Sequence, residues 1–468
     1  MRRRLLSLWG IRFRSCVAEL TTVLLFLLVG SAWGQEIIWS KTYGGLGEDG
    51  GLGGCQTSEG GYIVTGITLS YGSGAQVYLI KTDRRGDTLW ARTYGGAGWD
   101  QGNSVRQTSD GGYIVAGWTD SFGSAIQVYL IKTDSGGDTI WTRTYGGADW
   151  ENGVEVRQTR DRGYAIVGSK RIRPRIWDVY LIKTDSTGGL QWSRTYGGNR
   201  NDKGYSVEQT RDGGYIIAGY YGCAGYPDYS VYLIKTDPGG DTLWTRTYYP
   251  EGSWWSLGLD CALTWDGGYI VTGFSIDQAI DQDVYLIKTD AEGDTIWTRT
   301  YGGNNWESGA AVRPTYDGGY ILAGVSQDSA SGSNRIYLIK TDGEGDTLWT
   351  RIYGGSGGDS PYEVLLASDG GYLVVGATSS YGAGSADMYL LKISAFPEAI
   401  LAGDANGNGE VNVGDVVYLI NYLLKQGPSP ELPAGSDNNC DQAVNLEDVV
   451  YLLNYLFRNG PVPGYECA

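Results

Sequence analysis

The chain has 468 residues, contains no histidine and carries a formal net charge of −17. The lack of histidine excludes Ser-His-Asp triads and His-ligated zinc, and an acidic surface disfavours a nucleic-acid partner because it repels phosphate backbones. Any catalytic site would have to use carboxylates, Tyr, Lys, Ser or bound calcium.

The N-terminal segment, residues 1–34, has the pattern of a secretory signal peptide. Five arginines precede the apolar stretch Thr22–Val29, and Ala32-Trp33-Gly34 offers a small-residue cleavage site before Gln35. The apolar run is too short to span a bilayer, and no later segment is long enough. We therefore expect a secreted chain, extracellular or at the cell surface, with no transmembrane segment in its mature form. Loss of five Arg and one Glu with the signal would bring the net charge to −21.

A phrase of about twenty residues recurs along most of the sequence, as in Tyr78-LIKTDRRGDTLWARTYGG. The tryptophan near its end repeats every 51 to 53 residues, at Trp39, Trp90, Trp141, Trp192, Trp244, Trp297 and Trp349. This period is typical of β-propeller blades rather than of helical solenoids.

Each repeat contains four short segments rich in Val, Ile, Tyr, Thr or Trp, separated by Gly and Asp clusters. In the second repeat they are Ser104–Thr108, Tyr113–Thr119, Val128–Thr133 and Thr139–Tyr145. Alternating β-formers between tight-turn signals predict antiparallel strands, and no segment of the repeat has helical periodicity. The fold class expected here is an all-β propeller.

The two ends of the repeat region are complementary. It begins with a lone outermost strand, Ile37–Tyr43, and ends after a third strand, Met388–Ile393. Pairing the two would complete the last blade and hide both edges, which otherwise invite aggregation. We therefore predict a closed propeller of seven blades over residues 35–394.

The phrase Asp134 to Trp141, with its Gly-Asp-Thr-Ile-Trp ending, resembles the tryptophan-docking repeat of PQQ-type quinoprotein propellers and the Asp-box hairpins of sialidases. The resemblance implies that each Trp packs between neighbouring blades. Because the Asp-to-Trp spacing fits neither pattern, no quinone cofactor or sialidase chemistry is carried over. The repeated lysines are expected to be architectural, paired with the Asp83 series or with other repeated acids. Function should lie where the repeats differ.

The loops between the second and third strands, and between consecutive blades, should emerge on one face and vary in length, which favours this face for binding. Several tryptophans fall in or beside these loops, either packed down on the propeller or exposed as platforms for sugar rings or a protein partner. The candidate ligand-binding residues are Trp99, Trp118, Trp150, Trp177, Trp255 and Trp306. The acidic residue that follows most of the inter-blade loops is expected to cap a turn.

After an expected linker, residues 395–402, a different repeat begins, with two loops rich in Asp and Asn that each precede an apolar helical segment. Together they resemble a type I dockerin over residues 403–468, which implies a docking tail that binds two calcium ions. Glu410 and Ala443 would contribute backbone carbonyls. The implied ligands are Asp404, Asn406, Asn408, Glu410, Asn412 and Asp415 in the first loop, and Asp437, Asn439, Asp441, Ala443, Asn445 and Asp448 in the second.

The module departs from the dockerin pattern at two places. Gln442 stands where the second loop usually has Gly, and the partner-selecting pairs are Val413-Gly414 and Leu446-Glu447 rather than Ser/Thr. A cohesin-type partner and a calcium-stabilised tail both remain open. An extracellular setting permits a disulfide between Cys440 and Cys467, which flank the second helix, while three further cysteines, Cys55, Cys223 and Cys261, have no assigned partner.

Three functional classes survive. The favoured one is a non-catalytic binding or scaffolding propeller for a glycan or an extracellular protein. The second is a carbohydrate-active hydrolase of O-glycosyl bonds in polysaccharide catabolism, although no carboxylate pair at glycosidase spacing stands out from the repeats. The third is a cell-surface adhesion protein.

Overall fold

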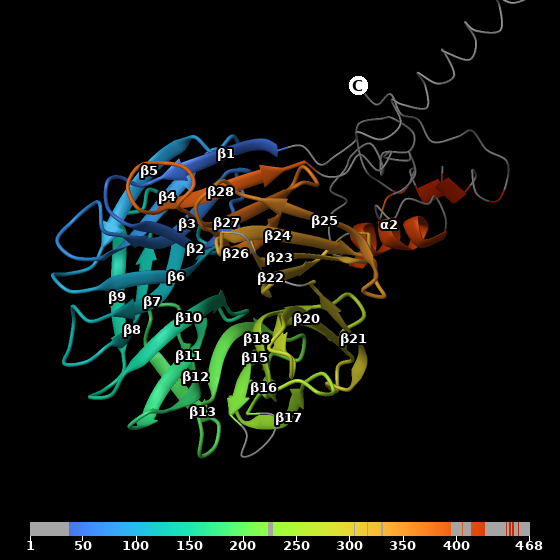
Figure 1. Ribbon diagram of the computed structural model, residues 1–468, viewed down its shortest axis with the longest axis horizontal. Coiled ribbons are helices and arrows are strands. Elements are labelled where there is room, and N and C mark those ends of the chain that lie inside the picture. The colour runs from blue at the N-terminus through green and yellow to red at the C-terminus, as the bar shows by residue number, and fades with distance from the viewer. Residues whose placement is uncertain are drawn as a thin grey trace, which may run out of the picture.

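The computed structural model describes residues 37–222, 228–303, 305–315, 317–328, 331–394, 405, 413–425, 446, 449–450, 452–453 and 457. The expected signal segment 1–34 and linker 395–402 lie outside these residues. The described chain is a ring of β-sheets with one described helix, α2 (Val413–Lys425) (Figure 1). No described helix has both the length and the apolar character needed to cross a membrane.

The strands follow one plan in each repeat, with the first strand innermost and the fourth outermost. The first strands are β2 (Asp49–Gln56), β6 (Asp100–Gln107), β10 (Glu151–Gln158), β14 (Lys203–Gln209), β18 (Trp255–Leu263), β22 (Glu307–Pro314) and β26 (Asp359–Leu366). The second strands are β3 (Tyr62–Thr68), β7 (Tyr113–Thr119), β11 (Tyr164–Arg173), β15 (Tyr215–Gly222), β19 (Tyr269–Ile276), β23 (Tyr320–Gln327) and β27 (Tyr372–Thr378).

The outer half of each repeat carries the repeated phrase of the sequence. The third strands are β4 (Gln76–Thr82), β8 (Gln127–Thr133), β12 (Ile176–Thr184), β16 (Tyr229–Thr236), β20 (Gln282–Thr289), β24 (Asn334–Thr341) and β28 (Asp387–Ile393). The fourth strands are β5 (Thr88–Tyr94), β9 (Thr139–Tyr145), β13 (Leu190–Tyr196), β17 (Thr242–Tyr248), β21 (Thr295–Tyr301), β25 (Thr347–Tyr353) and β1 (Ile37–Tyr43).

Hydrogen bonding joins the described strands into antiparallel four-stranded units such as β2-β3-β4-β5. Two of the units are linked into a single eight-stranded sheet by one parallel contact, between Tyr229 and Trp255. A glycine recurs in every second strand because the neighbouring backbone comes very close. At Gly117, for example, an added Cβ would collide with the carbonyl oxygen of Gln101.

The ring closes through the N-terminal strand, as the sequence predicts. β1 pairs antiparallel with β28, with Tyr43 opposite Met388, and so completes the unit that starts at β26 (Figure 1). Each innermost strand contacts the next one around the ring, and β2 contacts β26. Both ends of the described repeat region are thereby paired.

The apolar core lies between neighbouring units. Each repeated Trp is half-buried against a Tyr of the next unit, as for Trp39 and Tyr62, whose ring centroids are 6.1 Å apart. The Trp39 ring also covers Gly86 in the adjoining turn, and the Tyr43 hydroxyl donates to the Gly86 carbonyl at 2.6 Å. The expected packing of Trp between blades is therefore observed.

The repeated lysines are buried and paired with acids in the turn between the first two strands of each unit, not with the Asp83 series. Lys132 Nζ lies 2.9 Å from Asp110 Oδ2, in the turn between the first two strands of its own unit. Asp134, two residues after Lys132, instead accepts hydrogen bonds from the backbone N–H groups of Gly136 and Asp138. The repeated lysine thus fixes the turn between inner strands, while the Asp83 series caps the outer turn.

Candidate functional site

The two faces of the ring differ in how their loops are built. We define the variable-loop face by the connections between second and third strands and between successive units, which the antiparallel order places on the same side. The opposite side, the turn face, carries the short turns such as 108–112 and 134–138. Differences among the repeats are concentrated on the variable-loop face and on the innermost strands.

At six of the seven inner strands an acidic residue at or just before the first position caps the preceding loop, as expected, while β18 has Ser256 at this place. Asp202 Oδ2 accepts from the Gly198 N–H at 2.7 Å, and Asp100 Oδ2 accepts from the Gly96 N–H at 2.8 Å. These carboxylates are buried, so they fix loop conformation and do not form an open charged mouth.

The six candidate tryptophans divide into two groups. Four of them, on or at the end of the inter-unit loops, expose 41% to 52% of their surface: Trp99, Trp150, Trp255 and Trp306. The other two, Trp118 on β7 and Trp177 on β12, are partly buried. Trp177 holds a loop in place, because its backbone bonds to Asn201 and Asp202 and the Lys203 ammonium lies 5.3 Å from its ring centroid.

Two of the exposed indoles have ordered neighbours. The Arg171 guanidinium lies 5.0 Å from the Trp150 ring centroid, so part of the basic segment 170–175 packs on this ring. Trp255 meets Tyr229 edge to face, with centroids 5.3 Å apart and planes at 83°. Each indole thus keeps an exposed surface while a neighbouring side chain limits its rotation.

Trp255 and Tyr229 form one wall of a cavity of about 390 Å³ on the variable-loop face. The rest of the lining is polar or charged apart from Ile176: Arg175, Asn199, Arg200, Asn201 and Asp228. Arg175, in the tight turn between β11 and β12, has a φ of 66°, a left-handed conformation that is uncommon for a residue with a side chain. An aromatic wall beside planar amide, carboxylate and guanidinium groups can stack on one ligand face and hydrogen-bond to another.

A second cluster lies inside the ring, on the innermost strands. Arg106 Nη2 and Arg157 Nη2 lie 3.0 Å and 2.7 Å from Glu155 Oε1. Arg157 also pairs with Glu208, and Arg313 pairs with both Asp260 and Glu363. These seven side chains, 9% to 23% exposed, form one continuous network, which we call the channel network: Arg106, Glu155, Arg157, Glu208, Asp260, Arg313 and Glu363.

The channel network has four carboxylates for three guanidinium groups. Burial raises the pKa of Glu155, against the opposing charges of Arg157 and Arg106. Burial works to lower the pKa of Arg157, yet the charges of Glu155 and Glu208 raise it above its ordinary value. The carboxylates are held by guanidinium groups rather than poised as a free acid and base, so the network orders the channel more readily than it transfers protons.

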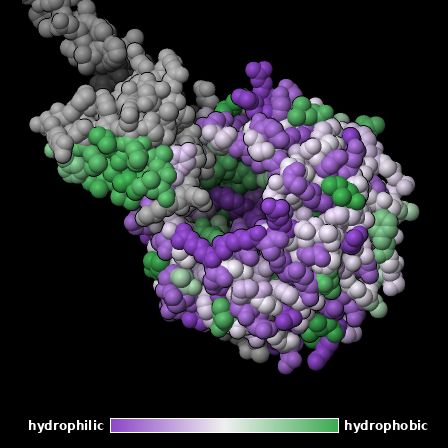
Figure 2. Space-filling view, turned by 180° about the vertical axis from the view of Figure 1, so that it is seen from behind, coloured by the Kyte–Doolittle hydropathy of each residue, from purple (hydrophilic) through white to green (hydrophobic). Residues whose placement is uncertain are grey.

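Beside the channel network is a cavity of about 390 Å³ lined by residues from all seven innermost strands. Its wall includes Leu52, Tyr205, Leu259 and Tyr362 together with Glu155. Figure 2 shows the corresponding hollow at the centre of the ring, with both hydrophilic and hydrophobic residues around it. It is a second place where the units differ and where a small ligand would fit.

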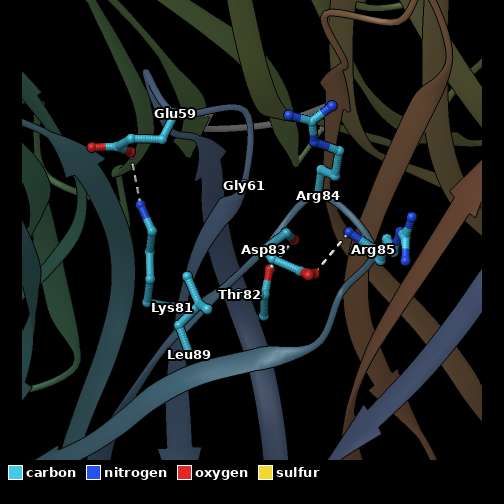
Figure 3. A pocket seen from close by; sticks show the side chains of 8 residues that line it. All are labelled: Glu59, Gly61, Lys81, Thr82, Asp83, Arg84, Arg85 and Leu89. Atoms are coloured by element: carbon cyan, nitrogen blue, oxygen red, sulfur yellow. Dashed lines mark hydrogen bonds and ion pairs between the residues drawn. The ribbon is translucent and has the colours of Figure 1, made fainter.

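A third cavity, of about 380 Å³, lies on the turn face beside β4 (Figure 3). Lys81 and Glu59 form an ion pair of 3.0 Å within it, and the Asp83 carboxylate accepts from the Arg85 N–H at 2.8 Å. No aromatic side chain lines it, and Lys81, Asp83 and the acid at Glu59 have counterparts in other units, whereas Arg84 and Arg85 do not. We assign it an architectural role.

The sequence reasoning missed the channel network. Its members occupy two positions of the first strand that change from repeat to repeat, such as Ser104 and Glu155 at one and Arg106 and Arg157 at the other. These differences among the repeats could have been recognised in the sequence, because the alternation of Arg with an acid within otherwise repeated strands has no local explanation. Glu155, Asp260 and Glu363 are acids that stand out from the repeat background, and they were not singled out from the sequence.

The described part of the C-terminal segment has its own small core. Val416 and Leu419 of α2 are buried together with Val449 and Leu452, which occupy the equivalent positions of the second copy. Asp415, in the first turn of α2, is fully buried. The other expected calcium ligands, both candidate disulfide cysteines, Cys440 and Cys467, and also Cys223 lie outside the described residues. Cys55 and Cys261 are not in a disulfide.

Residues 402–457 match the family model of the dockerin type I domain. The chain therefore combines a propeller-like repeat fold with a C-terminal type I dockerin domain. As a class these domains bind calcium and dock onto cohesin domains, which supports a docking function for this end of the chain. Such domains occur in extracellular, cellulosome-type proteins.

No curated protein matches the chain. Among solved structures, similarity is found to Sqt1 from Chaetomium thermophilum, at 12% identity and a TM-score of 0.44, covering 75% of this chain and 87% of that one. A protein of unknown function from Dyadobacter fermentans has 11% identity, a TM-score of 0.45 and coverages of 77% and 99%. A puromycin hydrolase has 12% identity, a TM-score of 0.46 and coverages of 70% and 50%. Likenesses this weak carry no argument about function.

Proposed function

We propose that this chain is a secreted, non-catalytic binding protein whose propeller holds a glycan on the variable-loop face while its dockerin domain docks it to a cohesin-type partner. The observation that carries the proposal is the cavity walled by Trp255 and Tyr229. The Trp255 side chain is 41% exposed beside Tyr229 and can stack on a sugar ring, and the adjoining Asn199, Asn201 and Asp228 can hydrogen-bond to hydroxyls.

Further indoles extend this surface around the ring. Trp99, Trp150 and Trp306 stand on equivalent inter-unit loops, each at least 44% exposed. A chain-like ligand could contact several of them at once, so that weak individual contacts add up along its length. The dockerin domain would bind two calcium ions and hold the propeller near its partner, with the polysaccharide or cell surface within reach.

A non-catalytic role is favoured over hydrolysis for a chemical reason. Retaining and inverting glycosidases need one carboxylic acid and one free carboxylate on either side of the scissile bond. In the channel network, Glu155, Asp260 and Glu363 each pair with an arginine. The cavity at Trp255 has a single carboxylate, that of Asp228, among its lining residues.

The test is a glycan array probed with the full chain, followed by incubation with each glycan that binds. We expect binding to one class of glycan and no release of reducing ends. A blank array together with binding to an extracellular protein would replace the glycan by a protein ligand. Release of reducing ends would place the chain among the dockerin-borne hydrolases instead.

A further inference from the structure

The lining of the cavity at Trp255 is positively charged, in contrast to the chain as a whole. The chain has a formal net charge of −17, yet the guanidinium groups of Arg175 and Arg200 line this cavity against one carboxylate, that of Asp228. Residues 223–227, which directly precede Asp228, include no acidic residue in the sequence. A local excess of positive charge in an acidic protein attracts negatively charged ligands to that place.

The two arginines belong to one of the seven inter-unit loops and to the hairpin beside it. Arg200 is two residues before the capping acid Asp202, and no other unit has a basic residue at this position. The equivalent residues are Gly47, Gly98, Asp149, Trp254, Asn305 and Gly357. Arg175 lies in the turn of the β11–β12 hairpin, whose strands pair as far as Arg173 and Ile176. The repeat does not impose these arginines, so their placement has a local reason.

Neighbouring basic residues are neutralised within the protein, whereas these two are not. Lys170 Nζ lies 3.2 Å from Glu151 Oε1, and Arg171 Nη2 lies 3.5 Å from Asp149 Oδ1. Arg175 and Arg200 are exposed, and no carboxylate of the described chain is within ion-pair distance of either. Each guanidinium thus offers its planar set of N–H donors to a ligand in the cavity, a geometry that suits carboxylate and other oxyanions.

The turn at Arg175 does not need an arginine side chain. Arg175 follows Pro174 in a two-residue turn and has a φ of 66°. A positive φ directly after Pro is typical of a turn position that favours Gly or Asn. Arg162, in the turn 159–163 of the opposite face, is also exposed and has nearly the same φ, 64°. The charge of Arg175 can therefore be removed without harm to the fold, and Arg162 is its matched counterpart away from the cavity.

We propose that the glycan held at Trp255 is acidic, with a carboxylate or sulfate group bound by Arg175 and Arg200 while a sugar ring stacks on the indole. This inference rests on the proposed function and names the class of glycan. The carboxylate of Asp228 repels an anionic group on its own side of the cavity, so it favours one orientation of the ligand. The exposed Trp255 side chain favours a sugar over an acidic peptide, because a sugar ring presents an apolar face for stacking.

The test compares the affinity of the full chain for oligosaccharides that share a backbone and differ in charge. One pair is oligogalacturonate and its methyl ester, which reports on a carboxylate. The other is sulfated and unsulfated dextran oligosaccharide, which reports on a sulfate. We expect the acidic member of at least one pair to bind about tenfold more tightly than its neutral form. The preference should shrink as the salt concentration rises from about 0.05 M to about 0.5 M, because salt screens exposed charges.

Two variants remove the positive charges one at a time. Arg175→Asn places a residue that favours the turn conformation, so its Tm should not fall. We expect Arg175→Asn and Arg200→Gln each to lower the affinity for the acidic oligosaccharide about threefold, as for an exposed ion pair, and to leave the affinity for the neutral form unchanged. Arg162→Asn makes the same change of charge and backbone preference on the opposite face and should alter neither affinity.

The outcomes separate this inference from the proposed function. Equal binding of acidic and neutral forms, or equal affinities of the parent, Arg175→Asn and Arg200→Gln for the acidic form, would overturn the inference. The proposed function would then still stand if Trp255→Ala weakened binding of the neutral glycan. Absence of binding to every oligosaccharide would overturn both. Binding of polyglutamate in place of all oligosaccharides would also overturn both and assign the arginines to an acidic peptide.

Discussion

Arg106 on β6 and Glu363 on β26 lie 257 residues apart in the sequence, yet Nη2 of the arginine is 3.4 Å from Oε2 of the glutamate. The guanidinium also donates to the Gly54 carbonyl of β2 at 3.0 Å, so it links three consecutive innermost strands across the point where the ring closes. Ring closure therefore depends on the channel network at the inside as well as on the β1–β28 pairing at the outside.

Arg313 is the member of the channel network whose loss should lower the free energy of unfolding most. Arg313→Met would leave Asp260 and Glu363 without their shared guanidinium in a buried position. We expect the free energy of unfolding to fall by about 3 kcal/mol, because a buried charge without its partner is costly. Chemical denaturation measures this. Arg351→Met on the outermost strand, whose exposed guanidinium bonds only to the Thr350 carbonyl among the described residues, is the control and should change stability by less than about 0.5 kcal/mol. Equal effects of the two substitutions would contradict the structural role of the network.

Deletion of residues 37–43 should expose the edge of β28. The last unit would keep three strands, and Trp39 would no longer cover Tyr62 of the first unit. We expect a large fall in Tm and aggregation at the unpaired edge, measured by calorimetry and light scattering. As a control, Leu46→Ala, at a side chain that is 89% exposed, should melt with the parent. A deleted chain that melts with the parent would show that closure does not depend on β1.

The stability of the calcium-free chain should depend on pH in two opposite directions. Asp178 and Asp283 have folded-state pKa values of about 6, raised mainly by burial from 3.8, so folding takes up protons and stability rises as the pH falls from 7 towards about 4.5. Burial acts to raise the pKa of Asp110, but hydrogen bonds from Thr108, Lys132 and the Gly112 N–H lower it to about 2. Its contribution is present above pH 4 and is lost as the pH falls from 4 towards 2. Urea denaturation in a chelating buffer should therefore give maximal stability between about pH 4 and pH 4.5. A stability that rises monotonically to pH 8 would contradict this assignment.

Much of the fold follows from the sequence because the repeat imposes the same packing problem on every unit. The innermost strand is less predictable. The second repeat predicts a strand from Ser104, but β6 begins at Asp100, because the glycine-rich start is held in the sheet by a bulge between Gly102 and Ser104 and by contact with neighbouring units. Such contacts are non-local, so the strand propensity of these residues does not reveal them.

The candidate site was predictable only in part. The sequence placed Trp255 at an inter-unit loop but left open whether it is exposed or packed down. Its partner Tyr229 comes from the preceding unit and becomes a neighbour through the parallel contact of β16 and β18. Trp177 illustrates the opposite case, since an indole in a variable region turned out to support a loop. In the C-terminal segment, α2 starts at Val413, inside the first expected calcium loop, whose last implied ligand is Asp415.

Chelation of calcium should unfold the dockerin domain and remove the helical signal of α2. The buried Asp415 in the first turn of α2 would lose the cation that its loop is expected to bind. The small core of Val416, Leu419, Val449 and Leu452 is too limited to keep the domain folded alone. Far-ultraviolet circular dichroism with and without chelator measures the loss, while β-sheet signal from the propeller serves as the internal control. Unchanged helical signal in chelator would contradict calcium-dependent folding.

The central claim is that the variable-loop face binds a glycan through the cavity at Trp255. Its most direct test is the affinity of the full chain for the array-selected glycan, measured by calorimetry for the parent, Trp255→Ala and Trp265→Ala. Trp265 is the matched control, because it is 53% exposed against 41% for Trp255 and lies in a turn of the opposite face. We predict that Trp255→Ala lowers affinity about tenfold, a loss of about 1.4 kcal/mol, with an unchanged Tm, and that Trp265→Ala changes neither quantity. Equal affinities for Trp255→Ala and the parent, or an equal loss in both variants, would contradict the claim.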